Sequence, residues 1–285
     1  MPRPRIALAL GSGGLKGMAH IGVLRALEEA EIRPTLYAGS SAGALVAAAA
    51  AHGVALAELE SIADRLQRTP FFQIDYASLL RYGLRTPALY RSERLLSLCD
   101  ELFGDTTFRE LRTPLVVSTV DVETASPLWW GLTGLPDASI ADAVYASCAM
   151  PGLLPPGRVS NRLCMDGGVL DPLALGAVAP LADLVIAVVL DSGSSPPPGR
   201  ALGGAPSLWW HAQSMVMRDL SRHTIEQWDG PPLVVIRLDL RKVHSLRGGN
   251  PRQVIRAGYE GACKVLCQSE ALATKPGGVR PLLDS

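Results

Sequence analysis

Residues Gly39 to Gly43 have the types and the spacing that expose a nucleophilic serine. They read G-S-S-A-G, which fits the pattern G-x-S-x-G and places Ser41, rather than Ser40, between the two glycines. In that pattern a tight turn from a strand into a helix exposes the hydroxyl, and small neighbours let the two elements approach closely. The N–H of Ala42 would then point to where negative charge develops on an attacked carbonyl. A serine that merely caps a helix after a turn is the alternative interpretation.

A second glycine cluster, Gly11 to Gly17, reads G-S-G-G-L-K-G. Backbone N–H groups in such a loop can bind the phosphate of a dinucleotide. Lys16 occupies the place of that motif's last glycine, and the segment after Leu36 lacks the acidic residue that would bind ribose. Consecutive glycine N–H groups equally form a small anion-binding concavity that suits an oxyanion. Lys16 would either add positive charge to it or lie in solvent.

Asp166 stands between a short apolar segment and two glycines, Gly167 and Gly168. An aspartate in that position could do no more than shape a turn. A serine hydroxyl, however, is a weak nucleophile that needs a group to accept its proton. Considered together with the other two segments, Asp166 is the carboxylate that we expect to accept it.

Histidine is the usual base for a serine nucleophile, and the chain has five histidines. His20 has the spacing of a helix face packed on a sheet, which favours a structural role, and His52 ends an alanine-rich helix. The other three follow both the serine and the aspartate, so a Ser-Asp-His order of the α/β-hydrolase type stays open. These three are His211, His223 and His244, and none stands in a glycine-flanked loop.

The elements that would position these residues alternate in type along the chain. Residues 6–10 are a continuous apolar run typical of a strand buried on both faces, and residues 17–30 have helical spacing. Residues 36–39 indicate a second strand, and residues 42–52 an alanine-rich helix that Gly53 ends. This alternation predicts an α/β fold with a central, mostly parallel sheet flanked by helices.

Later segments continue the pattern within one domain that we expect to span residues 1–285. Further strands are predicted at residues 115–120, 162–165, 184–190 and 233–238, and further helices at 56–67, 92–103, 140–147, 208–227 and 251–268. Residues 71–90 are rich in aromatics at their start and have no clean period, so they suit either a substrate-facing cap or a packed connection. The Ser-, Gly- and Pro-rich residues 192–206 predict a mobile loop, after which residues 207–285 complete the domain as helix, strand and helix.

Composition and charge restrict the class of protein. Hydrophobic residues make up 48% of the 285 residues, and 27 Lys and Arg balance 27 Asp and Glu, so no general basic surface points to nucleic acid. The five cysteines lack a metal-ligand grouping, which favours buried reduced thiols and no metal. The first apolar run is too short for a secretory signal, and residues 42–57 are too few to span a bilayer. We therefore expect a cytoplasmic protein that would meet lipid only from the membrane surface.

Together the three ordered segments resemble the patatin-like phospholipase family, in particular its small bacterial cytoplasmic members. Supporting stretches lie at residues 19–24, 147–152 and 166–172, and the resemblance covers most of residues 5–190. It implies a three-layer α/β/α fold and a Ser-Asp dyad, with Ser41 as nucleophile and Asp166 as general base. It also implies a glycine-loop oxyanion hole, a fatty acyl ester as substrate, and neither cofactor nor metal.

The chain departs from the family pattern at two positions of the glycine loop. The family commonly has glycine and arginine where this chain has Ser12 and Lys16. Ser12 leaves the N–H groups of Gly13 and Gly14 available, and Lys16 keeps the charge but loses the planar guanidinium. We therefore expect an oxyanion hole at Gly13, Gly14, Lys16 and Ala42, with the N–H groups of Gly13, Gly14 and Ala42 as its donors. The competing hypotheses are a Ser-Asp-His esterase, a nucleotide-binding or regulatory module, and a scaffold without turnover.

Overall fold

The structure is a computed structural model that describes residues 4–68, 72–86, 88–131, 135–191, 205–241, 243 and 249–269. Its centre is an eight-stranded sheet with the order β5-β6-β3-β2-β1-β7-β8, in which β4 also pairs with β3. The strands are β1 (Ile6–Leu10), β2 (Leu36–Ser40), β3 (Leu115–Asp121), β4 (Ser126–Gly131), β5 (Gly157–Val159), β6 (Arg162–Asp166), β7 (Leu184–Asp191) and β8 (Leu233–Asp239). Strands β3, β2, β1, β7 and β8 are parallel, while β4, β5 and β6 pair in antiparallel fashion.

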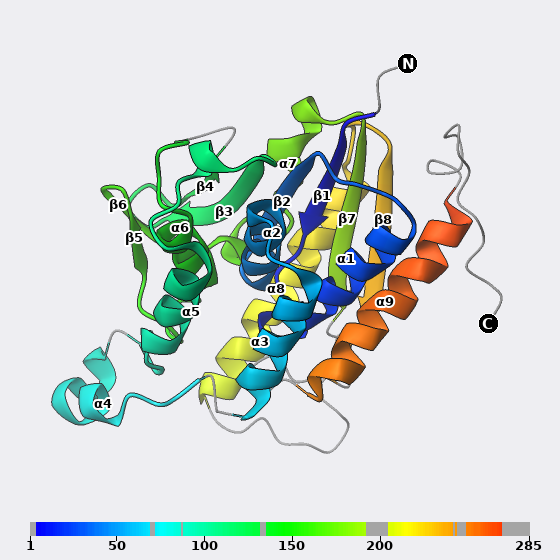
Figure 1. Ribbon diagram of the computed structural model, residues 1–285. Coiled ribbons are helices and arrows are strands. Elements are labelled where there is room, and N and C mark those ends of the chain that lie inside the picture. The colour runs from blue at the N-terminus through cyan, green and yellow to red at the C-terminus, as the bar shows by residue number, and fades with distance from the viewer. Residues whose placement is uncertain are drawn as a thin grey trace.

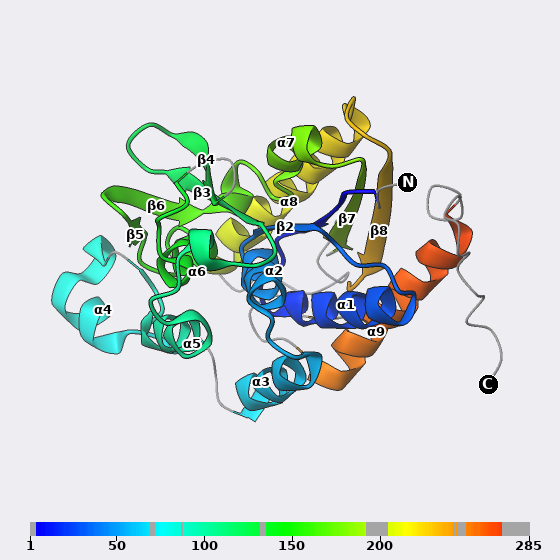
Figure 2. The same ribbon diagram turned by 45° about the horizontal axis from the view of Figure 1, so that its top comes forward.

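Helices cover both faces of this sheet, as Figures 1 and 2 show. One face carries α1 (Ala19–Glu29), α2 (Ala42–His52), α3 (Leu56–Arg68), α5 (Glu93–Phe103), α6 (Ile140–Cys148) and α9 (Pro251–Gln268). The other carries α7 (Leu175–Val178) and the long α8 (Ala205–Glu226). The short α4 (Tyr76–Tyr82) lies at the periphery, and single 3₁₀ turns occur at Gly14–Met18 (η1), Gly83–Arg85, Phe108–Glu110, Gly167–Val169 (η4) and Ala179–Leu181.

Two separate apolar cores explain why β1 is apolar at every position. Leu8 and Leu10 face the core shared with α1, α2 and α9, whereas Ala7 and Ala9 face the core shared with α7 and the end of α8. Successive side chains of a strand point to opposite faces, so a strand covered on both sides needs an unbroken apolar run. This arrangement confirms the predicted α/β class and the mostly parallel sheet.

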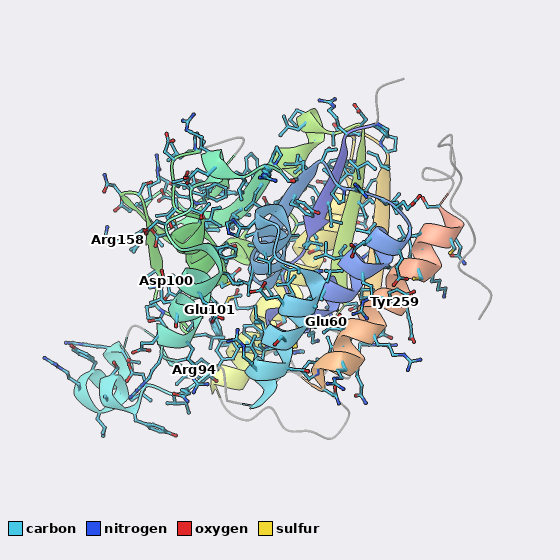
Figure 3. The ribbon with its side chains drawn as sticks, in the orientation of Figure 1. Glu60, Arg94, Asp100, Glu101, Arg158 and Tyr259 are labelled. Atoms are coloured by element: carbon cyan, nitrogen blue, oxygen red, sulfur yellow. The ribbon has the colours of Figure 1, made fainter. Side chains whose placement is uncertain are left out.

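Helices α1 and α9 pack unusually closely on one face. A Cβ on Gly22 would lie 1.9 Å from the carbonyl oxygen of Ile255, and a Cβ on Gly258 equally close to that of Ala19. The Tyr259 hydroxyl, labelled on α9 in Figure 3, donates a 2.6 Å hydrogen bond to Glu29 at the end of α1. The last helix thereby supports the helix that follows the glycine loop.

Most predicted elements occur within one or two residues of their expected bounds. The predicted start of α8 was three residues late, and the first helix begins as the 3₁₀ turn η1 before α1. Strands β4 and β5 and helices α4 and α7 had no counterpart in the prediction. Residues 192–204 of the predicted mobile loop lie outside the described residues, and 205–206 already belong to α8. Among the described residues, no helix combines the length and apolarity that crossing a bilayer requires.

Candidate active site

Ser41 occupies a strained turn between β2 and α2. Its backbone has φ 56° and ψ −126°, which is costly for a residue that carries a Cβ. The turn is tight because a Cβ on Gly39 would lie 2.5 Å from Gly43, and a Cβ on Gly43 would lie 2.0 Å from the carbonyl oxygen of Leu10. The two glycines of the motif therefore let β2, α2 and the end of β1 meet, and they hold Ser41 at the tip.

Two further serines hold this turn from the side. The N–H of Ser41 donates to the hydroxyl oxygen of Ser147 at 2.8 Å, and the Ser147 hydroxyl donates to the carbonyl oxygen of Ser118 at 2.6 Å. Ser147 belongs to α6 and Ser118 to β3, and both are completely buried. Ser147 begins one of the stretches that resemble the family, but its local sequence gave no sign of this contact.

The Ser41 hydroxyl donates a 2.7 Å hydrogen bond to Oδ2 of Asp166. The other carboxylate oxygen of Asp166 accepts from the N–H of Gly168 at 2.7 Å. Asp166 is 1% exposed, and its burial raises the pKa of the carboxyl group to about 7, against the smaller lowering effect of these two hydrogen bonds. The pair therefore has a carboxyl group that changes charge near neutral pH.

Sheet register explains how residues so distant in sequence come together. Strand β4 pairs with β3 along one edge, so β2 and β6 must share the other edge. Ser40, the last residue of β2, pairs with Ser118, and Asp166, the last residue of β6, pairs with Thr119. The two strands run towards each other and end at neighbouring positions of β3, where Ser41 and Asp166 meet.

The glycine loop is fixed against the sheet at its beginning. The N–H of Gly11 donates to Val188 on β7 at 3.0 Å, and the N–H of Ser12 donates to the carbonyl of Pro172 at 3.1 Å. The Nε2 atom of His20 lies 2.8 Å from the carbonyl oxygen of Gly11. Because that carbonyl can only accept, Nε2 carries the proton and His20 supports the loop as a neutral donor, consistent with burial that lowers its pKa to about 4.

The glycine loop also touches the serine turn. A Cβ on Gly17 would lie 2.5 Å from the Cβ of Ala42, the first residue of α2. Gly14 has φ 57°, a left-handed conformation that suits glycine. The first N–H groups of a helix have no partner within it, and Ala42 is the first residue of α2. The N–H of Ala42 is therefore not used inside α2, and it lies where the helix meets the glycine loop. Gly13, Gly14, Ser41 and Ala42 are thus neighbours where the glycine loop meets the serine turn.

Gly13, Gly14 and Ser41 face a small cavity of about 80 Å³ with mainly apolar walls. Gly13, Gly14, Ser41 and Asp166 contribute its polar end. The rest of the wall comes from five separate segments and includes Phe72, Met150, Leu153, Leu173, Leu190, Trp210 and Met217. Such a pocket, apolar except for a few convergent polar groups, is typical of a site for an apolar small molecule.

Lys16 does not lie in solvent, which was one of the two settings expected for it. Its side chain is 2% exposed and is not among the residues that line the cavity. Burial lowers the pKa of Lys16 to about 8, while the carboxylates of Asp191 and Asp239, at the ends of β7 and β8, act in the opposite direction. The Lys16 side chain is therefore buried near the ends of these two strands.

No histidine hydrogen-bonds to Ser41 or Asp166 within the part of the chain that the structure describes. His223 binds the carbonyl of Asp219 one turn earlier in α8, and His211 lies outside the cavity lining. His244 lies outside the described residues. The described residues also hold no cluster of three or more side chains that could bind a metal ion.

All five cysteines are free thiols, but they are not uniformly buried. Cys99 and Cys164 are buried, Cys148 and Cys263 are half-buried, and Cys267 is exposed near the end of α9. The expectation of buried thiols was therefore wrong for Cys267, which lies on the outer side of an amphipathic helix.

Comparisons with known proteins identify the family to which this sequence is similar. The family described as patatin-like phospholipase matches residues 8–179. An uncharacterised NTE family protein of Mycobacterium tuberculosis is 35% identical over 207 residues, which are 72% of this chain and 54% of that protein. Patatin-like phospholipase domain-containing protein 6 of Mus musculus is 30% identical over 212 residues, 72% of this chain and 15% of that protein. This chain thus spans about half the length of the mycobacterial relative.

Among solved structures, VipD from Legionella pneumophila has a similar fold. The TM-score is 0.60 at 17% identity, over 94% of this chain and 67% of that one. At that identity the likeness concerns the arrangement of helices and strands alone.

Proposed function

Because this chain belongs to the patatin-like phospholipase family, we propose that it hydrolyses acyl esters of lipids with Ser41 as nucleophile and Asp166 as the only side-chain base. The observation that carries the proposal is the 2.7 Å hydrogen bond from the Ser41 hydroxyl to a buried carboxylate, at the polar end of an apolar cavity. Such a pair supplies both the nucleophile and the group that takes up its proton.

In the proposed first step, Oγ of Ser41 attacks the ester carbonyl carbon while Asp166 accepts the hydroxyl proton. The carbonyl oxygen becomes an oxyanion, which the N–H groups of Gly13, Gly14 and Ala42 stabilise. Loss of one such donor typically costs on the order of 10²-fold in rate. Collapse of the tetrahedral intermediate breaks the ester bond, and Asp166 returns the proton to the leaving alcohol oxygen.

In the proposed second step, water hydrolyses the acyl-enzyme. Asp166 accepts a proton from the water as its oxygen attacks the acyl carbonyl, and the same N–H groups bind the second oxyanion. Collapse releases the carboxylic acid, and the proton returns to Oγ of Ser41. No redox cofactor is needed, because the oxidation state of every atom is unchanged.

The environment of Asp166 supports its role as base. A carboxylate with an ordinary pKa is too weak a base to take a proton from a hydroxyl efficiently, and a pKa near the working pH improves proton transfer. Burial raises the pKa of Asp166 to about 7. The apolar cavity wall, with Phe72, Trp210 and Met217, supports an acyl chain as the group bound beside Ser41.

A fluorophosphonate probe tests this proposal, since it labels only an activated serine. We expect the native protein to be labelled and Ser41→Ala to remain unlabelled. Ser40→Ala is the matched control, because the Ser40 hydroxyl is buried and has no hydrogen-bond partner in the described structure. It should keep the label. An unlabelled native protein would instead favour the nucleotide-binding or scaffold hypothesis.

Hydrolysis of p-nitrophenyl esters of increasing chain length, followed by lysophospholipids and phospholipids, would define the substrate. The same assay separates the dyad from a Ser-Asp-His triad. Alanine at His211, His223 or His244 should each leave the rate within about threefold, because the proposed base is Asp166. A loss of several orders of magnitude at any one of these histidines would defeat the dyad.

A further inference from the structure

Helix α4 exposes large apolar side chains at the edge of the molecule. Leu80 is 90% exposed, Tyr76 66% and Tyr82 49%, and no residue of this seven-residue helix is buried. Tyr76 and Leu80 are one turn apart and share a side of the helix. Single exposed apolar residues are common on protein surfaces, but such a group on one short helix indicates a surface that binds something.

The same segment is basic. Residues 72–91 contain three arginines, Arg81, Arg85 and Arg91, against one acidic residue, Asp75. Arg91 lies 3.9 Å from Asp75, whereas no ion pair within the described part of the chain involves Arg81 or Arg85. The guanidinium of Arg81 lies 5.4 Å from the centre of the Tyr82 ring. Aromatic and aliphatic side chains beside arginines are typical of helices that lie in the interface of an anionic bilayer.

The residues around α4 connect it directly to the cavity. Phe72, four residues before the helix, lines the cavity and packs on Tyr90, with ring centres 5.3 Å apart. After the helix, the N–H of Leu89 donates to Gly152 at 3.0 Å and the N–H of Tyr90 donates to Leu153 at 2.9 Å. Leu153 also lines the cavity. The segment is thus anchored at both ends to the cavity wall.

Helix α4 lies at the end of the molecule towards which the parallel strands run. In Figure 1 it projects at the lower left. Figure 3 shows it beyond the labelled Arg94 of α5, at the periphery. Ser41 follows β2 at this same end of the sheet. A flat surface in contact with α4 would therefore lie at the same end of the sheet as Ser41.

We propose that α4, with Arg81 and Arg85, is the surface through which this protein binds an anionic lipid bilayer. Tyr76 and Leu80 insert at the level of the head groups, and the two arginines bind lipid phosphates. The inference rests on the proposed function, because a lipid substrate is what selects a bilayer as the partner. Its consequence is that a lipid acyl chain passes from the bilayer along Phe72 towards Ser41.

Vesicle sedimentation with the full chain carrying Ser41→Ala measures binding without turnover. We expect this protein to pellet with vesicles of phosphatidylcholine and phosphatidylglycerol, more weakly with phosphatidylcholine alone, and less as salt is raised. Leu80→Glu, and separately Arg81→Glu with Arg85→Glu, should each weaken binding to the anionic vesicles by about tenfold or more.

Leu135→Glu is the matched control for Leu80→Glu. Leu135 is 46% exposed and comes four residues after Gly131, which pairs with Val116 at the beginning of β3, whereas Ser41 lies where the strands end. It should bind vesicles as the parent does. Circular dichroism and thermal melting should be unchanged in all the variants, because each replaced side chain is exposed.

The outcomes distinguish this inference from the proposed function. Failure of the Ser41→Ala protein to pellet, or unchanged pelleting of the α4 variants, overturns the bilayer surface while fluorophosphonate labelling of the native protein still stands. A dimer in sedimentation velocity that Leu80→Glu dissociates also overturns it, in favour of a second copy of this chain on α4. With Ser41 intact, the α4 variants should hydrolyse p-nitrophenyl butyrate at the native rate but vesicle lipids at least about tenfold more slowly.

Discussion

Ser41 and Asp166 meet because β3 positions both of them, although neither belongs to it. Ser41 follows the residue that pairs with Ser118, and Asp166 pairs with the next residue, Thr119. The 2.7 Å hydrogen bond between them therefore depends on the register of the sheet and not on the conformation of a loop. Backbone hydrogen bonds on both sides of β3 resist small movements, which keeps the two side chains in a geometry suited to proton transfer.

The pH dependence of hydrolysis should follow the ionisation of Asp166. Only the carboxylate form can accept the Ser41 proton, and burial raises the pKa of this group to about 7. We therefore expect kcat/KM to rise about tenfold per pH unit below pH 7 and to level off above it. Hydrolysis of a soluble p-nitrophenyl ester between pH 5 and pH 9 measures this profile. A midpoint near pH 4 would contradict a buried carboxylate base.

Asp166→Asn should separate stability from activity. The folded pKa of about 7 exceeds the ordinary value of 3.8, so the folded state binds the proton more tightly than the unfolded state does. Stability from this group is then present at low pH and is lost as pH rises from about 4 to 7. Because asparagine does not titrate, the variant should gain melting temperature relative to the native protein at pH 8, while losing about 10³-fold or more in rate.

Asp183→Asn is the control for that prediction, with the opposite sign. The hydrogen bond from Arg5 lowers the pKa of this exposed carboxylate, so its contribution is present above the ordinary pKa and is lost as pH falls. Replacing it should cost a little stability at pH 8 and nothing in activity. Thermal melting at pH 5 and pH 8 measures how the melting temperature of each variant changes with pH. Equal changes in the two variants would mean that burial does not destabilise the ionised form of Asp166.

The sequence was sufficient wherever a local pattern determines the structure. The apolar run of β1 and the alanine run of α2, which Gly53 ends, predicted these elements at their observed bounds. The turn at Ser41 was predictable for the same reason, since its glycines are required by contacts between adjacent elements. Local pattern failed for α4, which buries no face and so has no apolar period to detect.

Contacts between residues distant in sequence explain where the structure differs from the prediction. Lys16 has the local setting of a loop cation, but the carboxylates that face it stand at Asp191 and Asp239, and only the assembled sheet brings them near. Ser147 supports Ser41 across 106 residues, and a buried serine in a helix has no local signal for that contact. Strand β4 is half exposed and exists through its pairing with β3, which its own sequence does not encode.

Ser147→Ala should loosen the turn that carries Ser41. The buried N–H of Ser41 would lose its acceptor, which typically costs about 1–3 kcal/mol in the free energy of unfolding. We expect a rate about tenfold or more below that of the native enzyme, because the position of Oγ is then less well fixed. Chemical denaturation and ester hydrolysis measure the two effects.

Ser118→Ala is a suitable control for Ser147→Ala. The contact with Ser147 uses the carbonyl oxygen of Ser118, which alanine keeps, while the lost hydroxyl donates only to the carbonyl of Asp171 at 3.3 Å. It should therefore lose less activity than Ser147→Ala. Equal losses in the two variants would show that general packing, and not the contact with the Ser41 N–H, supports the turn.

Gly17→Ala should separate the glycine loop from the serine turn, and a second substitution should restore their contact. The new Cβ would lie 2.5 Å from the Cβ of Ala42, which is closer than two non-bonded carbon atoms can approach. The loop must therefore move away from α2. Because the loop carries Gly13 and Gly14, we expect a rate loss of about 10²-fold, as for a lost oxyanion donor. The measurement is kcat/KM for a soluble ester.

Ala42→Gly removes the atom with which the new Cβ collides but keeps the Ala42 N–H. The next-nearest atom of residue 42, its Cα, lies 3.5 Å away, an ordinary contact distance. The double variant should therefore recover most of the rate lost by Gly17→Ala, although glycine at the start of α2 costs up to about 1 kcal/mol in stability. Such recovery is a non-additive effect, as expected for residues in direct contact. If the two substitutions instead multiply their losses, the loop and the turn do not act on the same reacting group.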